Sequence, residues 1–246
     1  MLHVAALIAG LGLVPPLGTP SPSIVLNASD GVQVYAQAYP TADPRAPVIL
    51  LFHQAGSDKG EYAPIAPRLV ELGFNALAID QRSGGDLFAP NETVMHLGHS
   101  TRYEDALADM DTALHWAQKT HPGSPVYAWG SSYSAALVFV FAAKHPREIA
   151  AVLAFSPSEY LADKTAVHRA AAKIRVPVFI DSAADPQEIA AAKSILAVIP
   201  AKVKKQYVPR AGVHGSSTLR VDRDPTGSEY NWNAVTRFLR TLPSRK

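Results

Sequence analysis

Short apolar runs rich in β-branched residues alternate with amphipathic helical stretches along most of this 246-residue chain. The run Val48–Phe52 is continuously apolar, as expected of a central strand that is buried on both faces. Residues 103–119 carry apolar side chains at helical spacing, with acidic residues early and Lys119 late, as the helix dipole favours. This alternation predicts an α/β fold with a mostly parallel, twisted sheet of about eight strands and helices on both faces.

The same periodicity places the expected elements along the chain. A hairpin signal, Ser29-Asp30-Gly31, separates the first two expected strands. A long loop rich in Gly, Asn and His covers residues 80–101, and loops of that length usually have a function. Strands are expected at residues 24–27, 32–39, 48–52, 75–79, 126–129, 151–155, 176–180 and 204–208, and helices at 61–71, 103–119, 134–144, 187–199 and 230–242.

Composition narrows the classes of protein that the chain can represent. It has no cysteine, so disulfides, thiolate nucleophiles and iron–sulfur clusters are excluded, and any nucleophile must be oxygen or nitrogen. The formal net charge is only +2, which disfavours a nucleic-acid partner. With 48% hydrophobic residues, one large core suffices for a chain of this length.

The amino terminus does not follow the α/β pattern. Residues 4–14 form an apolar run that suits a signal peptide and is too short to span a bilayer. We therefore expect residues 1–23 to be a signal peptide or a disordered leader, and residues 24–246 to be a single domain. If the leader is a signal peptide, we expect the protein to be secreted or periplasmic; if it is not, we expect a cytoplasmic protein. In both cases no stable membrane insertion is expected.

A strand that runs directly into a helix through small residues marks the expected nucleophile. In Gly130-Ser131-Ser132-Tyr133-Ser134, small residues stand two before and two after Ser132, as the tight turn of a nucleophile elbow requires. The frame centred on Ser134 also satisfies the pattern, but it would place the nucleophile a full turn into the helix. Ser132 is therefore the expected nucleophile.

A serine nucleophile needs a general base and a carboxylate that orients the base. His214 follows the last expected strand in a glycine-flanked loop and is the expected base. Asp185 follows the strand before it and is the expected acid, although Asp185-Pro186 also suits a helix N-cap. Other acids lie near enough to compete for this role: Asp181, Glu188 and Glu159.

Backbone N–H groups are expected to stabilise a developing oxyanion. One donor is Tyr133, directly after the nucleophile, and the other is Gln54, in the loop after the strand Val48–Phe52. His96 and His99 have metal-ligand spacing but no evident third ligand, so no metal is expected.

At these positions the chain resembles the α/β-hydrolase family, in particular dienelactone-hydrolase-like and esterase-like members. The motifs that carry the resemblance span residues 50–56, 78–85, 130–134 and 214–215. The resemblance implies a serine hydrolase with the triad Ser132, Asp185 and His214 and with no cofactor. It also implies that Asp80 and Arg82 brace the turn after their strand rather than take part in chemistry.

The length of the segment after the strand at 151–155 and the side chains expected around the site suggest a substrate class. Residues 156–175 leave no room for a large cap domain, so an open site is expected, with His53, Phe88 and Tyr160 as substrate contacts. No charged cluster marks the pocket, which favours a small neutral ester as the small-molecule substrate. A peptidase acting on short peptides and a non-catalytic binding protein remain alternatives. The sequence does not define the oligomeric state.

Overall fold

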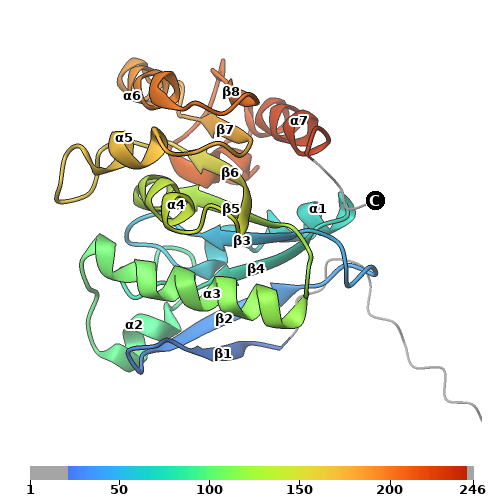
Figure 1. The fold of residues 1–246 in the computed structure, drawn as a ribbon, viewed down its shortest axis with the longest axis vertical. Coiled ribbons are helices and arrows are strands. Elements are labelled where there is room, and N and C mark those ends of the chain that lie inside the picture. The colour runs from blue at the N-terminus through green and yellow to red at the C-terminus, as the bar shows by residue number, and fades with distance from the viewer. Residues whose placement is uncertain (1–21, 243–246) are drawn as a thin grey trace, which may run out of the picture.

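A computed structural model describes residues 22–242 of the chain. The expected leader, residues 1–23, lies almost wholly outside this range and stays a prediction. The described residues form one eight-stranded sheet in the order β1-β2-β4-β3-β5-β6-β7-β8 (Figure 1). The strands are β1 (Ile24–Asn27), β2 (Gln33–Tyr39), β3 (Val48–Phe52), β4 (Asn75–Ile79), β5 (Val126–Ser131), β6 (Ile149–Phe155), β7 (Val178–Asp181) and β8 (Lys204–Gln206).

The sheet is parallel from β4 through β8, and β1 and β2 add an antiparallel hairpin at one edge. Because parallel strands end at the same edge, the loops that follow β3, β4, β5, β6 and β7 meet at the carboxyl edge of the sheet. The expectation of a mostly parallel sheet of about eight strands is confirmed.

Helices cover both faces of the sheet (Figure 1). The helices α3 to α6 share one apolar cluster with the sheet, and α1 and α7 share the other. Along β3, Val48, Leu50 and Phe52 belong to the first cluster, while Ile49 and Leu51 belong to the second. This explains the unbroken apolar run at 48–52. The helices are α1 (Ala66–Glu71), α2 (Glu92–Leu97), α3 (Leu107–Thr120), α4 (Tyr133–Lys144), α5 (Ala166–Ala171), α6 (Pro186–Val198) and α7 (Ser228–Leu239).

Several helical segments differ from the sequence expectation. The expected helix at 103–119 begins as a 3-10 helix, η2 (Tyr103–Ala106), and continues as α3. The stretch 61–71 divides into a 3-10 helix, η1 (Lys59–Tyr62), and α1, which carries a proline in its first turn. Proline suits a helix start because its missing N–H would be unpaired there anyway. The loop at 80–101 contains the helix α2. Asn91 caps the start of this helix, and Gly98, in the left-handed conformation, ends it.

The segment between β6 and β7 contains the short helix α5 and no cap domain. Among the described residues, no helix has the length and hydropathy needed to cross a membrane.

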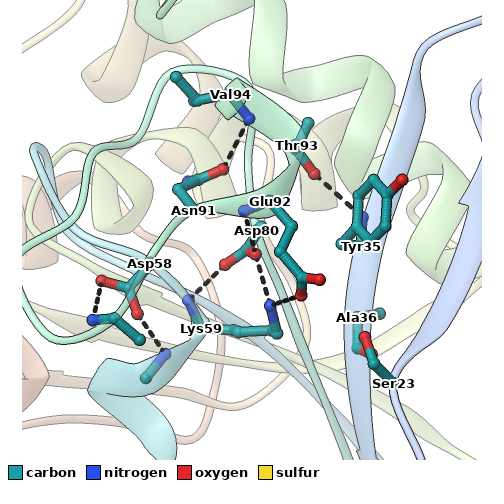
Figure 2. Close-up of polar contacts among 12 residues, drawn as sticks. Ser23, Tyr35, Ala36, Asp58, Lys59, Asp80, Asn91, Glu92, Thr93 and Val94 are labelled. Atoms are coloured by element: carbon teal, nitrogen blue, oxygen red, sulfur yellow. Dashed lines mark hydrogen bonds and ion pairs between the residues drawn. The ribbon is translucent and has the colours of Figure 1, made fainter. Parts of the chain in front are cut away.

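Ion pairs that include the fully buried carboxylates of Asp80 and Asp109 fix the loop that follows β4. Lys59 Nζ lies 2.6 Å from Asp80 Oδ2 and 2.5 Å from Glu92 Oε2, and the Glu92 N–H donates to Asp80 Oδ2 (Figure 2). Arg82 pairs with the fully buried Asp109 and also with Asp30. Asp80 and Arg82 therefore brace this turn, and they hold the loop beside the carboxyl edge.

Candidate active site

Ser132 stands in the sharp turn between β5 and α4. Its backbone has φ 58° and ψ −119°, a conformation that L side chains rarely adopt. The residue is 7% exposed, and it follows directly on the carboxyl end of β5. This is the geometry of a nucleophile elbow, in which the surrounding strand and helix hold a strained serine.

Small residues on either side of Ser132 make this turn possible. A Cβ on Gly130 would lie 2.2 Å from the Ser134 carbonyl oxygen, so only glycine fits there. Ser134 is fully buried, and its Oγ lies 2.7 Å from the His53 carbonyl oxygen and 2.9 Å from Gln81 Oε1. Ser134 thus ties two neighbouring loops to the elbow and is not placed as a nucleophile.

His214, in the loop after β8, contacts both the serine and a carboxylate. Its Nε2 lies 2.7 Å from Ser132 Oγ, and its Nδ1 lies 2.7 Å from Glu188 Oε1. An ionised carboxylate can only accept, so Nδ1 carries the proton and Nε2 is left to accept from the Ser132 hydroxyl. The three groups form a continuous Ser–His–carboxylate relay.

The acid in this relay is Glu188 and not Asp185, so the sequence expectation for the acid is wrong. Asp185 is the N-cap of α6, where its Oδ1 accepts from the N–H groups of Gln187 and Glu188 at 2.9 and 3.1 Å. An N-cap side chain turns back onto its own helix. Glu188, in the first turn of the helix, is the acid that reaches His214.

The other two competing acids have different partners. Glu159 lies 2.7 Å from His168 Nδ1 and accepts from the Val167 N–H. Asp181, the last residue of β7, is fully buried and accepts from the Ser182 N–H. Neither is at hydrogen-bond distance from the site histidine.

The surroundings of Glu188 favour its ionised form. Burial alone would raise the pKa of the Glu188 carboxyl, but hydrogen bonds from His214, Ser156 and the Ala183 N–H hold that pKa at about 2. Ser156 directly follows β6 with φ 55°, and its Oγ also accepts from the Gly215 N–H. Ser156 therefore connects the acid with the residue after the histidine. Ser156 is not among the site residues expected from the sequence, although its place at a strand end is a usable signal.

The expected oxyanion donor Gln54 is not available. Its N–H donates to Glu61 Oε2 at 2.8 Å. The next N–H along the loop, that of Ala55, donates to no acceptor among residues 22–242. The Tyr133 N–H, first in α4, also has no acceptor in this range, as expected at a helix start. Ala55, in the loop after β3, and Tyr133, at the start of the helix after the adjacent strand β5, thus both have a free N–H donor.

His53 is placed between two loops and not in a substrate pocket, so the expectation that it contacts substrate is wrong. It is fully buried, its Nδ1 lies 2.8 Å from the Gln54 carbonyl oxygen, and its Nε2 accepts from the Gln81 N–H at 2.9 Å. Burial lowers the pKa of His53 and keeps its ring neutral, as the accepting Nε2 requires. His53 therefore joins the loops after β3 and β4.

Of the other two expected substrate contacts, Tyr160 lies beside the histidine, whereas Phe88 packs against Arg220. The ring of Tyr160 stands edge-on to the His214 ring, with centroids 6.5 Å apart. The Arg220 guanidinium stacks on the Phe88 ring, 4.1 Å from its centroid. A pocket of about 430 Å³ opens beside the histidine; it is lined by Gln54, Leu87, Val213, His214, Ser217, Asp222 and Arg223.

The His96 and His99 pair has no metal-ligating surroundings. His96 stacks on Tyr35 and faces the Glu92 carbonyl oxygen through Nδ1. Residues 22–242 hold no group of three or more His, Asp, Glu or Cys side chains arranged to bind a metal ion.

The parallel sheet, the strained serine between β5 and α4 and the histidine after β8 together define an α/β-hydrolase. Residues 42–215 match the family described as serine aminopeptidase, S33, and the chain therefore belongs to that family.

Curated relatives and solved structures agree with this class. The chain is 28% identical over 125 residues to a monoacylglycerol lipase of Mycolicibacterium smegmatis. The aligned residues make up 51% of this chain and 42% of the lipase. It is 33% identical over 102 residues to lysophospholipase L2 of Escherichia coli, covering 39% of this chain and 28% of that enzyme. The chain thus matches less than half the length of these relatives.

Two solved structures share the fold. The dienelactone hydrolase of Anabaena variabilis superposes with a TM-score of 0.71 at 16% identity, covering 91% of this chain and 98% of that one. The Pyrococcus furiosus esterase Pf2001 gives a TM-score of 0.66 at 17% identity, with 89% of each chain covered. The expected α/β-hydrolase fold without a large cap is confirmed.

Proposed function

We propose that this protein is a serine hydrolase that cleaves small neutral carboxylic esters through an acyl-enzyme. The observation that carries the proposal is the unbroken line from Ser132 Oγ through His214 to Glu188, with 2.7 Å at each contact. A serine hydroxyl becomes a nucleophile only when a base takes its proton, and this line supplies both the base and the group that orients it.

In the first half-reaction, Ser132 Oγ attacks the ester carbonyl carbon while His214 Nε2 takes the hydroxyl proton. The negative charge that develops on the carbonyl oxygen is stabilised by the N–H groups of Tyr133 and Ala55. His214 then gives its proton to the departing alkoxide, the bond from carbon to the alcohol oxygen breaks, and the acyl group stays on Ser132.

In the second half-reaction, water takes the place of the alcohol. His214 Nε2 accepts a proton from the water as its oxygen attacks the acyl carbon, and then returns a proton to Ser132 Oγ as the carboxylic acid leaves. Glu188 stabilises the imidazolium in both halves. Its low pKa keeps it ionised through the neutral range, so it is ready to do so.

The pocket supports an ester more than a peptide with a free amino terminus. Such a peptide needs an unpaired carboxylate to hold its ammonium group, and the carboxylate in the pocket, Asp222, is paired with Arg220 at 2.9 Å. The two kinds of curated relative, a monoacylglycerol lipase and lysophospholipase L2, carry names that denote enzymes of lipid esters. Both points favour acyl esters as the substrate class.

The proposal is tested with a series of p-nitrophenyl esters, from acetate to decanoate, hydrolysed by the wild type and by Ser132→Ala. The wild type should turn over the shorter esters, and the variant should lose on the order of 10⁴-fold or more in kcat. Labelling by a fluorophosphonate probe should be present in the wild type and absent from the variant. Turnover that persists in Ser132→Ala, or a wild type that neither turns over nor labels, would refute the proposal.

A further inference from the structure

Glu61 is a buried carboxylate beneath the site that the proposed mechanism leaves unused. It lies in η1, and none of its surface is exposed. Buried carboxylates are costly unless they are well hydrogen-bonded. Glu61 accepts from the Gln54 N–H at 2.8 Å, from Ser131 Oγ at 2.8 Å and from Ser217 Oγ at 3.4 Å.

Each of these three partners lies in a different segment of the site. Gln54 comes just before Ala55 in the loop after β3. Ser131 directly precedes the nucleophile. Ser217 follows His214 by three residues. One carboxylate therefore joins the loop of a free N–H donor, the elbow and the loop of the base.

The loops pack closely where they meet Glu61. A Cβ on Gly215 would lie 2.4 Å from Ser131 Oγ and 3.7 Å from Glu61 Oε1, so this approach depends on glycine. Ser131 Oγ also accepts from the Ser216 N–H at 2.8 Å. A shift of the Glu61 carboxylate would therefore be passed on to the backbone next to His214.

The contact with Gln54 has a direct chemical consequence. A backbone N–H held by a carboxylate cannot donate to a substrate, so the donor role passes to the next N–H, that of Ala55. The loop turns here, because the Ser57 N–H donates to the Gln54 carbonyl oxygen and Gly56 has φ +66°. Glu61 thus holds one end of the turn that presents the Ala55 N–H.

Few charged groups face Glu61. Arg220 is the nearest cation, but its NH1 donates to the backbone carbonyl oxygens of Gly60 and Glu61, and its NH2 pairs with Asp222. The next residue is Tyr62, whose own pKa is raised by burial and by the Glu61 charge, so it stays neutral.

The carboxyl of Glu61 therefore changes its protonation near neutral pH. Burial raises its pKa to about 7, although the Gln54 N–H, Ser131 and the charge of Arg220 act to lower it. Around Glu61, a backbone N–H and two hydroxyls all point hydrogens at the carboxylate. A protonated carboxyl has to donate one hydrogen itself, so one hydroxyl contact has to reverse or be lost, and the bond from the Gln54 N–H loses the strength that the negative charge gives it.

We propose that Glu61 is a positioning residue, whose ionised carboxylate holds the turn at Gln54 and keeps the Ala55 N–H aimed at the reacting carbonyl oxygen. This rests on the proposed hydrolase function. When Glu61 takes up a proton the turn relaxes and one oxyanion donor is displaced. Misplacement of about 1 Å is enough to cost on the order of 100-fold in rate.

The kinetic test compares the wild type with Glu61→Gln, which has the same shape and cannot ionise. At pH 8.5 we expect kcat for p-nitrophenyl butyrate to fall roughly 10- to 100-fold in the variant, with KM within about threefold. At pH 6 the wild-type Glu61 is itself neutral, so the ratio of the two kcat values should approach one. A ratio that stays constant from pH 6 to pH 8.5, or equal kcat values throughout, would overturn the proposal.

A second measurement does not depend on turnover. Backbone hydrogen exchange of residues 53–57, compared with the intrinsic rate, should be faster in Glu61→Gln than in the wild type at pH 8.5. In the wild type itself, protection of this segment should fall as the pH drops through about 7, so the test stands even if the variant does not fold. Unchanged protection in both comparisons would overturn the proposal.

The matched control is Glu229→Gln, because Glu229 is an exposed carboxylate of α7 that pairs with Arg68 of α1. It should leave kcat, its pH dependence and the exchange of residues 53–57 as in the wild type. If the wild type hydrolyses none of the esters, the proposed function fails and the exchange measurement alone decides the role of Glu61.

Discussion

Asp185 and Glu188 lie three residues apart at the start of α6, yet their carboxylates bind different partners. Asp185 Oδ1 accepts from two backbone N–H groups of its own helix, one of them that of Glu188 itself. Glu188 Oε1 accepts from His214 Nδ1 at 2.7 Å. The first acid therefore fixes the helix start from which the second reaches the histidine.

The division of roles between these two acids predicts unequal effects of amide substitution. Glu188→Gln replaces one acceptor with a donor and removes the charge that stabilises the imidazolium, so kcat for p-nitrophenyl butyrate should fall roughly 10²- to 10⁴-fold. Asp185→Asn keeps an excellent capping residue, so kcat should stay within about threefold. The measurement is the steady-state kcat of Glu188→Gln and of Asp185→Asn at pH 8, each compared with the wild type.

Thermal melts supply the control for these two variants, since both should remain folded. An Asp185→Asn variant that loses as much activity as Glu188→Gln, at an unchanged melting temperature, would restore Asp185 as the acid.

The role proposed for the free N–H of Ala55 can be tested with proline, which has no backbone N–H and therefore removes this hydrogen-bond donor. Ala55 is the second residue of the turn Gln54–Ser57, and Gly56, the third, has φ +66°. This resembles a type II turn, in which proline fits the second position. Ala55→Pro should keep the fold and lower kcat by roughly 10²- to 10³-fold, the usual cost of one lost oxyanion donor.

Ala55→Gly is the matched control, because it alters the side chain and keeps the N–H. Its kcat should stay within about fivefold of the wild type. If Ala55→Pro and the wild type have equal activity and equal melting temperatures, the second oxyanion donor is not the Ala55 N–H.

Much of the fold could be predicted because its signals are local. Strand runs, helical spacing and the Gly130–Ser134 elbow each lie within a few residues of sequence, and chain order then pointed to His214. The acid could not be chosen in the same way. Asp185 and Glu188 follow the same strand, and what separates them is the direction in which each side chain leaves the first turn of α6.

The errors at His53 and Gln54 come from side-chain contacts that form only once the chain has folded. His53 is held by Gln81, 28 residues away, and Gln54 gives its N–H to Glu61, seven residues away. Neither pattern shows in the local sequence. The helix α2, by contrast, was missed although Asn91 and Gly98 are ordinary signals for a helix start and end.

The buried pair of Arg82 and Asp109 should contribute strongly to stability. Asp109 is fully buried, and its two oxygens accept from the Arg82 N–H at 2.8 Å and from Arg82 Nε at 2.9 Å. Asp109→Asn leaves the largely buried Arg82 with only the half-exposed Asp30 as its counter-charge, at a cost of about 3 kcal/mol. Asp109→Asn should therefore lower the melting temperature by roughly 6–12 °C at pH 7.5.

Asp30→Asn is the comparison, because Asp30 pairs with the same arginine from a side chain that is 45% exposed. Screening by water should hold its cost to about 1 kcal/mol or less. Similar melting temperatures for the two variants would contradict the importance of burial for this pair.

The buried carboxyl of Asp181 should make the stability of the protein depend on pH. Burial raises the pKa of its carboxyl from the ordinary 3.8 to about 8, assisted by the charges of Asp224 and Glu188 and opposed by the Ser182 N–H. Between these two pKa values the folded protein binds a proton that the unfolded chain releases. Stability therefore falls as the pH rises from about 4 to about 8.

Asp181→Asn should remove this contribution, because an amide oxygen can still accept from the Ser182 N–H and the side chain cannot ionise. Relative to the wild type, its melting temperature should be higher at pH 8.5 than at pH 5, so the difference between the proteins grows with pH. Asp86→Asn, at an exposed position, should run parallel to the wild type across this range. A difference between Asp181→Asn and the wild type that does not change from pH 5 to pH 8.5 would mean that the carboxyl of Asp181 ionises at the same pH in the folded and unfolded protein.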